Sequence, residues 1–407
     1  MRKLGVLSAP SQEVLSVLQH RATIEPLFPN LETLGLWYTT EELVQFIPLF
    51  LSPTTIVITI LLTKPSNLPN VMLASTLATF PMLCPNLQQI ALYSLPRNPM
   101  TTAAVSGMLL AANRNALRSI VVDSPLTEEV CEVVYQLPNL RVLSVVIEGN
   151  TQLPPPVLPN LTDLTIDYDH GSDWLKGFRG ATLGNLKTAA FYSGSEQIGN
   201  FLEEFERVAL ATSTQNTLSS FSLSTSCSWS PNYSSLLRFT QLTYLLVDPP
   251  CDDGCSSTVD DNVITVLARA MPKLEFLLLG EAPCSEIPTG VTVRGLTVLA
   301  HYCSDLSTLR VHFQVASLCT PPTIDWVTPI ERSTTLQKGC ALEELQVGEI
   351  PVAEGSVPTI ALTLAFIFPR IDSIDGVDED WENVMDTIRL SRQMVHYSSR
   401  EPLHTPN

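Results

Sequence analysis

Residues 137–166 read LPNLRVLSVVIEGNTQLPPPVLPNLTDLTI, and one eight-residue pattern occurs in this stretch twice. The copy PNLRVLSV (138–145) is followed 21 residues later by PNLTDLTI (159–166). Both copies follow P-N-L-x-x-L-x-Φ, where Φ is apolar, and the three apolar side chains can lie on one side of a short strand. A single strand of this length cannot bury its apolar side, so we expect it to stack on copies of itself.

The pattern recurs along the whole chain. We call the first apolar residue of each copy its anchor, and the predicted anchors are Leu31, Ile56, Leu87, Leu117, Leu140, Leu161, Leu186, Leu218, Leu242, Leu274, Leu306, Leu342 and Ile371. Successive anchors are 21 to 36 residues apart, with a mean of about 28, which is typical of long leucine-rich repeats.

Between the copies the apolar spacing becomes helical. Thr40, Thr127 and Thr258 are each followed by acidic residues within three positions, which predicts helix starts there. Residues 293–302, VRGLTVLAHY, predict a further helix. Strands joined by helical crossovers run parallel, so the sequence predicts an α/β leucine-rich repeat solenoid of about 13 repeats. We expect a horseshoe with parallel strands on its concave face and helices with irregular segments on its convex face.

The two ends differ from the repeats. Residues 1–27 predict an N-terminal cap helix that begins near Ser11 and covers the edge of the first strand. The solenoid is then expected over residues 28–377 and a C-terminal cap helix over 378–397, with a disordered tail at 398–407. In the second cap, Trp381, Val384, Met385 and Ile388 share one helix face, which we expect to be buried.

Composition restricts the partners. The formal net charge of -18 disfavours nucleic acid and anionic membrane surfaces, and 45% hydrophobic residues predict a large core. The sequence has no secretory signal pattern and no apolar run long enough to cross a bilayer, and its nine cysteines are scattered. We therefore expect a cytoplasmic or nuclear monomer with reduced thiols.

Side chains between the apolar strand positions are expected to be exposed on the concave face. They mix aromatic residues with both signs of charge, a composition that suits protein binding. The candidate protein-binding residues are Tyr93, Arg118, Arg141, Asp163, Asp167, Tyr192, Tyr244, Asp248, Glu275, Phe276, Arg310 and His312.

The sequence predicts no catalytic residue, no cofactor site and no metal site. Cys251 to Cys255, CDDGC, is the most site-like cluster, but no second pair of ligands stands at zinc spacing. Asp167, Asp169 and His170 follow a strand as ordinary turn residues do. The phosphate-loop, nucleophile-elbow and dinucleotide-binding motifs are absent from the sequence.

The segments FPNLETLGL (28–36) and CSDLSTLRV (303–311), together with DEDWENVMDTIRL (378–390), resemble the leucine-rich repeat region of fungal F-box proteins. The resemblance covers about residues 11–390. It implies that the repeats capture a substrate for a cullin-type ubiquitin ligase, to which an F-box docks through a Skp adaptor. The F-box opening pattern is missing here, so we expect Skp binding only if an F-box is restored.

Two other functions are compatible with the sequence. A free-standing scaffold or inhibitor would use the acidic surface to hold a basic protein. A GTPase-activating protein would need an arginine that reaches a phosphate from a loop after a strand, where Arg97 and Arg179 are the candidates.

Overall fold

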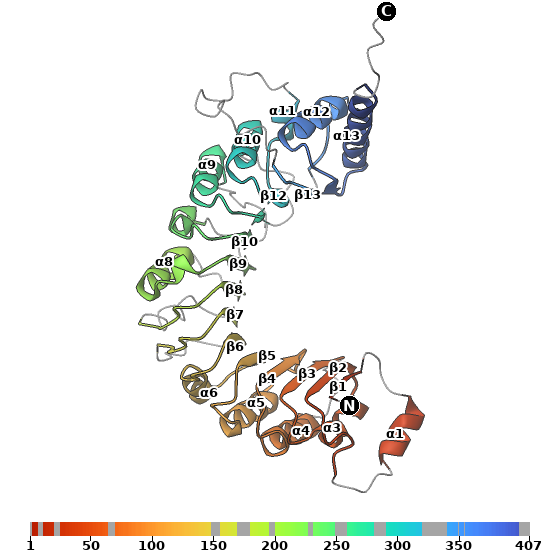
Figure 1. Ribbon diagram of the computed structural model, residues 1–407, viewed down its shortest axis with the longest axis vertical. Helices are drawn as coiled ribbons and strands as arrows, with labels where there is room; N and C mark the ends of the chain where they lie inside the picture. Colours follow the sequence, from red (N-terminus) through yellow and green to blue (C-terminus); the bar gives the residue numbers. More distant parts are fainter. Residues whose placement is uncertain are drawn as a thin grey trace, which may run out of the picture. The chain divides into compact units, whose positions relative to one another are not determined.

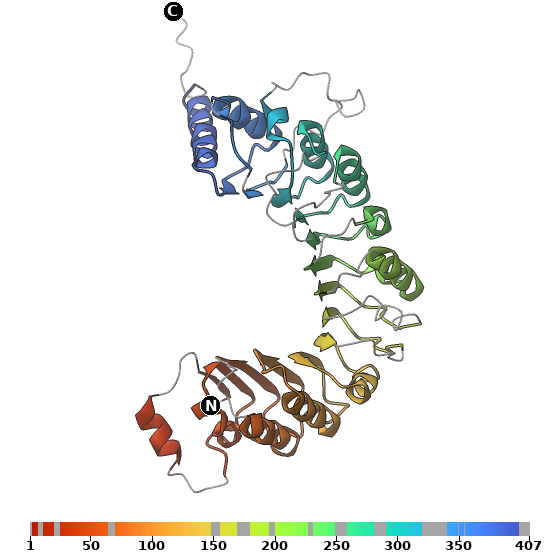
Figure 2. The same ribbon diagram turned by 180° about the vertical axis from the view of Figure 1, so that it is seen from behind.

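The computed structural model describes residues 2–6, 11–19, 25–63, 70–147, 155–168, 180–194, 200–226, 231–248, 259–280, 290–319, 340–348, 350–353 and 355–398. The chain divides into two compact units. The first comprises residues 1–197 and 207–217, and the second comprises residues 198–206 and 218–407. Within each unit, Figure 1 and Figure 2 show the strands side by side with the helices along one side of them.

The first unit holds eight strands in the described residues: β1 (Lys3–Val6), β2 (Thr33–Thr39), β3 (Val57–Leu62), β4 (Gln89–Tyr93), β5 (Ser119–Pro125), β6 (Val142–Ile147), β7 (Asp163–Tyr168) and β8 (Thr188–Ser193). Its helices are α1 (Gln12–Gln19), α2 (Glu41–Val44), α3 (Ile47–Phe50), α4 (Asn70–Leu83), α5 (Pro99–Ala111) and α6 (Glu128–Val134), followed by the 3-10 turn η2 (Thr214–Asn216).

The second unit holds β9 (Ser220–Thr225), β10 (Tyr244–Asp248), β11 (Phe276–Leu279), β12 (Thr308–Val311), β13 (Glu344–Gly348) and β14 (Ser373–Gly376). Its helices are the 3-10 helix η3 (Tyr233–Leu236), α9 (Asp261–Ala270), α10 (Val293–Tyr302), α11 (Val315–Leu318), α12 (Val357–Ile367) and α13 (Glu379–Ser398). The division between the units passes through α8 (Phe201–Thr212).

The strands of each unit are parallel and follow one another in chain order. Their register places equivalent positions of the repeats next to each other: Leu143 on β6 pairs with Leu164 on β7, and Leu164 pairs with Ala189 on β8. These three side chains are buried. The predicted α/β leucine-rich repeat solenoid is confirmed.

Twelve of the 13 predicted anchors are buried, with at most 3% of their surface exposed. The exception is Ile56, which is half-buried, and the anchor position of that repeat belongs to Thr55. Val57 pairs with Thr33, so Thr55 occupies the place that Leu31 has one repeat earlier. The Thr55 hydroxyl donates to the Leu31 carbonyl (3.0 Å), which satisfies the polar group inside the core.

The asparagine that precedes an anchor links neighbouring repeats. The Asn160 side-chain amide donates to the carbonyl of Pro138 (2.8 Å), and Asn185 donates to that of Pro159 (2.6 Å). Each bond reaches the proline that stands just before the equivalent asparagine in the preceding repeat. The asparagine in the P-N-L pattern is therefore an inter-repeat donor as well as a turn residue.

The helix predictions are partly corrected. Helix α10 spans the predicted residues 293–302, whereas residues 41–50 form two short helices, α2 and α3, in place of one. Helix α9 begins at Asp261 and is capped by Asp260, whose carboxylate accepts from the amides of Asn262 (3.0 Å) and Val263 (2.8 Å).

Strand β1 was not predicted. It pairs with β2 from Lys3 to Val6, so the edge of β2 that a cap helix was expected to cover is paired with a strand. At the other end, α13 packs against α12 and β14, and its predicted face is buried: Trp381, Val384, Met385 and Ile388. The Trp381 indole donates to the Ile350 carbonyl (2.8 Å).

The described cysteines are free thiols. Burial raises the pKa of Cys84 to about 11 and that of Cys303 to about 12, so both thiols stay protonated at neutral pH. The Cys303 sulfur lies 3.7 Å from the Met271 carbonyl, a weak bond to the preceding repeat. Among the described residues, no helix combines the length and apolar character required to cross a membrane.

Truncating an anchor should be costly. We expect Leu140→Ala and Leu274→Ala each to lower the free energy of unfolding by about 2–5 kcal/mol, because each leaves a cavity in the core. Urea denaturation followed by circular dichroism measures the change. The control is Ser144→Ala on the outward side of β6, which should shift the midpoint little; an equal loss at Ser144 would contradict the assignment of strand faces.

Candidate protein-binding surface

The strand face, meaning the side of each sheet opposite its buried side chains, is the candidate site. Its side chains form rows because equivalent positions on parallel strands lie about 5 Å apart. In the second unit one row runs through Tyr244, Phe276, Thr308 and Glu344. The next outward row runs through Leu246, Leu278, Arg310 and Gln346.

Four apolar side chains of these rows adjoin on β10 and β11. We call Tyr244, Leu246, Phe276 and Leu278 the apolar patch. All four are half-buried, and the rings of Tyr244 and Phe276 lie 5.7 Å apart between centroids with a 41° tilt. Tilted aromatic pairs at this distance attract one another, so the two rings hold each other in position.

An ion pair borders the apolar patch. The Arg310 guanidinium on β12 lies 3.2 Å from the Asp248 carboxylate at the end of β10, and only 21% and 20% of these side chains is exposed. The pair crosses β11 where Gly280 follows the strand with φ +85°. Glycine fits here because this backbone region disfavours other residues.

The predicted residue His312 is buried, with 9% of its surface exposed, which corrects the expectation that it is exposed. Its imidazole Cδ2 and Nε2 would each lie 3.7 Å from a Cβ at Gly280, so the ring packs against that glycine. His312 is therefore a packing residue beneath the strand face.

The strand face of the first unit is different. Its central outward row is made of small or short side chains: Gly35, Thr59, Ala91, Val121, Ser144, Thr165 and Ala190. Larger side chains stand at the strand ends, where Tyr93 is half-buried and Trp37 and Tyr192 are exposed. The Trp37 indole nitrogen would lie 3.3 Å from a Cβ at Gly35, so the ring lies over that glycine.

A loop is fastened across these strand ends. Residues 94–98 lead from β4 to α5, and the Asp123 carboxylate on β5 accepts the amides of Ser94 and Leu95 (3.0 Å for Leu95). Arg97 reaches further, to the Asp167 carboxylate on β7 (3.1 Å). Burial raises the pKa of Asp123, and the two amides and Arg97 act in the opposite direction.

The structure separates the predicted site residues into groups. Tyr244, Phe276, Asp248, Arg310 and His312 come together on β10 to β12, and Tyr93, Asp167 and Tyr192 lie at strand ends of the first unit. The others lie at the start of their strands or directly after an anchor: Arg118, Arg141, Asp163 and Glu275.

Several residues considered in the sequence analysis lie outside the part of the chain that the structure describes. The CDDGC cluster at 251–255, Asp169, His170 and Arg179 lie outside the described residues. Within the described part of the chain, no three His, Cys, Asp or Glu side chains gather as a metal site would require. Trp37 and the fastening role of Arg97 were missed, because both depend on cross-strand register that the linear pattern does not give.

Comparison with known proteins gives a likeness to solved structures but no family assignment. No protein-family model and no curated protein matches the chain. Among solved structures, the crystal structure of the leucine-rich repeat-containing protein LegL7 from Legionella pneumophila is similar at 11% identity, with 95% of this chain and 97% of that chain covered. The TM-score of 0.31 is low, so the fold assignment rests on the strand ladder and the buried anchors described above.

The fastened loop gives a prediction. We expect Asp123→Ala to speed amide hydrogen exchange at residues 94–98 by about tenfold or more, because two amides lose a half-buried acceptor. Asp167→Ala removes only the partly exposed ion pair and should change exchange there less than severalfold. Hydrogen exchange by mass spectrometry compares the two variants, and a larger effect from Asp167→Ala would refute this account of the loop.

Proposed function

We propose that this chain is a protein-interaction module that captures its partner non-covalently on the strand face of the second unit. The observation that carries the proposal is the apolar patch bordered by the Asp248–Arg310 ion pair. Four half-buried apolar side chains on two adjacent strands serve no inward packing role, because the buried positions between them, such as Leu245 and Leu277, already fill the core.

The chemistry of this surface suits a protein partner. Aromatic residues and arginine supply most of the binding energy at protein interfaces when water is excluded around them. Here the patch can bury an apolar side chain of the partner, and the ion pair beside it is already partly desolvated. Because Arg310 and Asp248 are held by each other, the surface needs little reordering on binding.

The identity of the partner is proposed from two sources. The resemblance to fungal F-box proteins favours a substrate of a ubiquitin ligase, with this chain as the substrate-recognition part. The net charge favours a basic partner, since the chain has 41 acidic and 23 basic residues. Glu275, Glu343 and Glu344 lie near the patch at the starts of β11 and β13. The two proposals share the same binding surface and differ only in the fate of the captured partner.

The structure favours the GTPase-activating alternative less. Such a protein needs an arginine that can reach a phosphate. The Arg97 guanidinium is paired with Asp167 at 3.1 Å and also lies near Asp123, so using it would require breaking this arrangement.

Variants of the patch test where the partner binds. We expect the double change Tyr244→Ala and Phe276→Ala to weaken capture at least tenfold, because it removes the aromatic half of the patch, and Arg310→Ala to weaken it severalfold. Quantitative mass spectrometry compares proteins retained from host lysate by each immobilised variant. The control is Phe366→Ala, which removes an exposed ring from α12 on the helix side. A stable partner that all the variants retain equally would place the binding surface elsewhere.

A second experiment separates the two proposed fates of the partner. Purified Skp adaptor is titrated against this chain and against a form preceded by any further residues that its transcript encodes. If the chain is the substrate-recognition part of a ligase, we expect only the extended form to bind the adaptor. Failure of both forms to bind, with partner capture intact, would exclude the adaptor role and leave the scaffold or inhibitor.

A further inference from the structure

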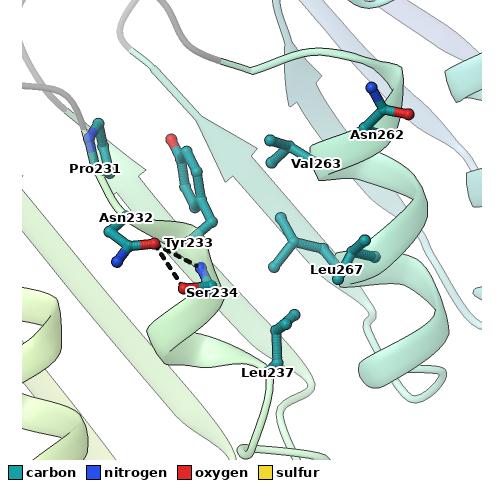
Figure 3. A pocket seen from close by; sticks show the side chains of 9 residues that line it. Pro231, Asn232, Tyr233, Ser234, Leu237, Asn262, Val263 and Leu267 are labelled. Atoms are coloured by element: carbon teal, nitrogen blue, oxygen red, sulfur yellow. Dashed lines mark hydrogen bonds between the residues drawn. The ribbon is translucent and has the colours of Figure 1, made fainter.

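The helix side of the second unit contains a groove that the strand-face function does not use. It lies between η3 and α9, which belong to consecutive repeats, and has a volume of about 440 Å³. Figure 3 shows Tyr233, Ser234 and Leu237 on one side of it and Val263 and Leu267 on the other. Its size falls in the range of small-molecule pockets, which is roughly 300–1,000 Å³.

The walls of the groove are mainly apolar. Val263, Val266 and Leu267 present one face of α9, where positions three and four apart adjoin, and Leu237 lies opposite them. Leu267 is fully buried, whereas 46% of Val266 is exposed. The groove therefore has a closed floor and an open mouth, and a ligand can enter it without any movement of the helices.

One polar group is available inside. Only 6% of Tyr233 is exposed, and its hydroxyl lies between Pro231 and Val263 (Figure 3). We find no hydrogen-bond partner for this hydroxyl in the part of the chain that the structure describes. Burial raises the pKa of Tyr233, so the group stays a neutral phenol that can both donate and accept.

Several other polar groups near the groove already have partners. The Asn232 carbonyl oxygen accepts from the Ser234 hydroxyl (2.6 Å), and its amide nitrogen donates to Glu203 (2.8 Å). The Asp260 carboxylate caps α9, and Asp261 accepts from the Thr292 amide (2.8 Å) and hydroxyl (2.7 Å). Three carboxylates near the groove, those of Glu203, Asp260 and Asp261, disfavour an anionic ligand, and each already accepts at least one hydrogen bond, which reduces what it would gain from a cation.

We propose that this groove binds a neutral small organic molecule with an apolar body and one hydrogen-bonding group, which pairs with the Tyr233 hydroxyl. Phenols and alcohols of the size of a substituted benzene fit this description. Such a ligand would form a hydrogen bond with the Tyr233 hydroxyl, which can be reached from the groove, while its apolar body fills the apolar space. The site is independent of the strand face, so either proposal can fail without the other.

Three probes of one shape test the proposal on the full chain. They are p-cresol, toluene and p-toluate, which offer a neutral hydroxyl, no polar group and a negative charge. Ligand-observed NMR titration should show saturable binding of p-cresol at about 1 mM or tighter, weaker binding of toluene and no binding of p-toluate. Absence of saturable p-cresol binding, or preference for p-toluate, would overturn the proposal.

Matched variants assign the binding to the groove. Tyr233→Phe removes the unpaired hydroxyl without disturbing packing, and should lower p-cresol affinity about three- to tenfold while leaving toluene unchanged. Val266→Trp should block the groove and abolish binding of both probes. The control Leu362→Trp changes an exposed residue on α12 and should have no effect. If p-cresol binds all three variants equally, the groove is not the site.

Discussion

The backbone hydrogen bond beside each anchor is the interaction on which the rest of the structure depends. The backbone amide of the residue after an anchor donates to the backbone carbonyl of the equivalent residue in the preceding repeat. The examples are Arg141 to Arg118 (2.7 Å), Thr162 to Arg141 (2.8 Å) and Glu275 to Thr243 (2.8 Å). This hydrogen bond fixes the register between repeats, and the register in turn aligns the buried leucines into rows. The asparagine side chains before the anchors add a second hydrogen bond between neighbouring repeats.

Because the repeat constrains only the inward positions, the outward ones are free to differ between the units. The first unit uses small residues along its central row, whereas the second places leucines and arginine there. The ion pair of Asp248 and Arg310 joins β10 to β12, two strands that are both paired with β11. The proposed binding surface therefore depends on which side chains the register brings side by side more than on any single residue.

This distinction explains what the sequence could predict. Anchors have a local signature, so twelve of them were predicted correctly, and the error at Ile56 arose because a hydroxyl group, satisfied by hydrogen bonds, fills the place of a leucine at Thr55. Strand β1 carries the later apolar positions of the pattern, since Leu4 and Val6 lie opposite Leu34 and Leu36, but the P-N pair that marks the clear copies does not precede them, so the strand was not recognised. The outward positions were predicted as a set, but their grouping, the burial of His312 and the fastening of Arg97 to Asp167 need the register between strands.

The groove on the helix side follows from differences in length between the repeats. Repeats of unequal length must share one strand spacing, so the length difference is absorbed on the helix side. The repeat from Leu218 to Leu242 is 24 residues long and contains the four-residue η3, whereas the next is 32 residues long and contains the ten-residue α9. A short helix beside a long one leaves part of the long helix uncovered, here Val263 and Val266. Variation in repeat length, which leaves the strand ladder unchanged, is thus what creates a pocket.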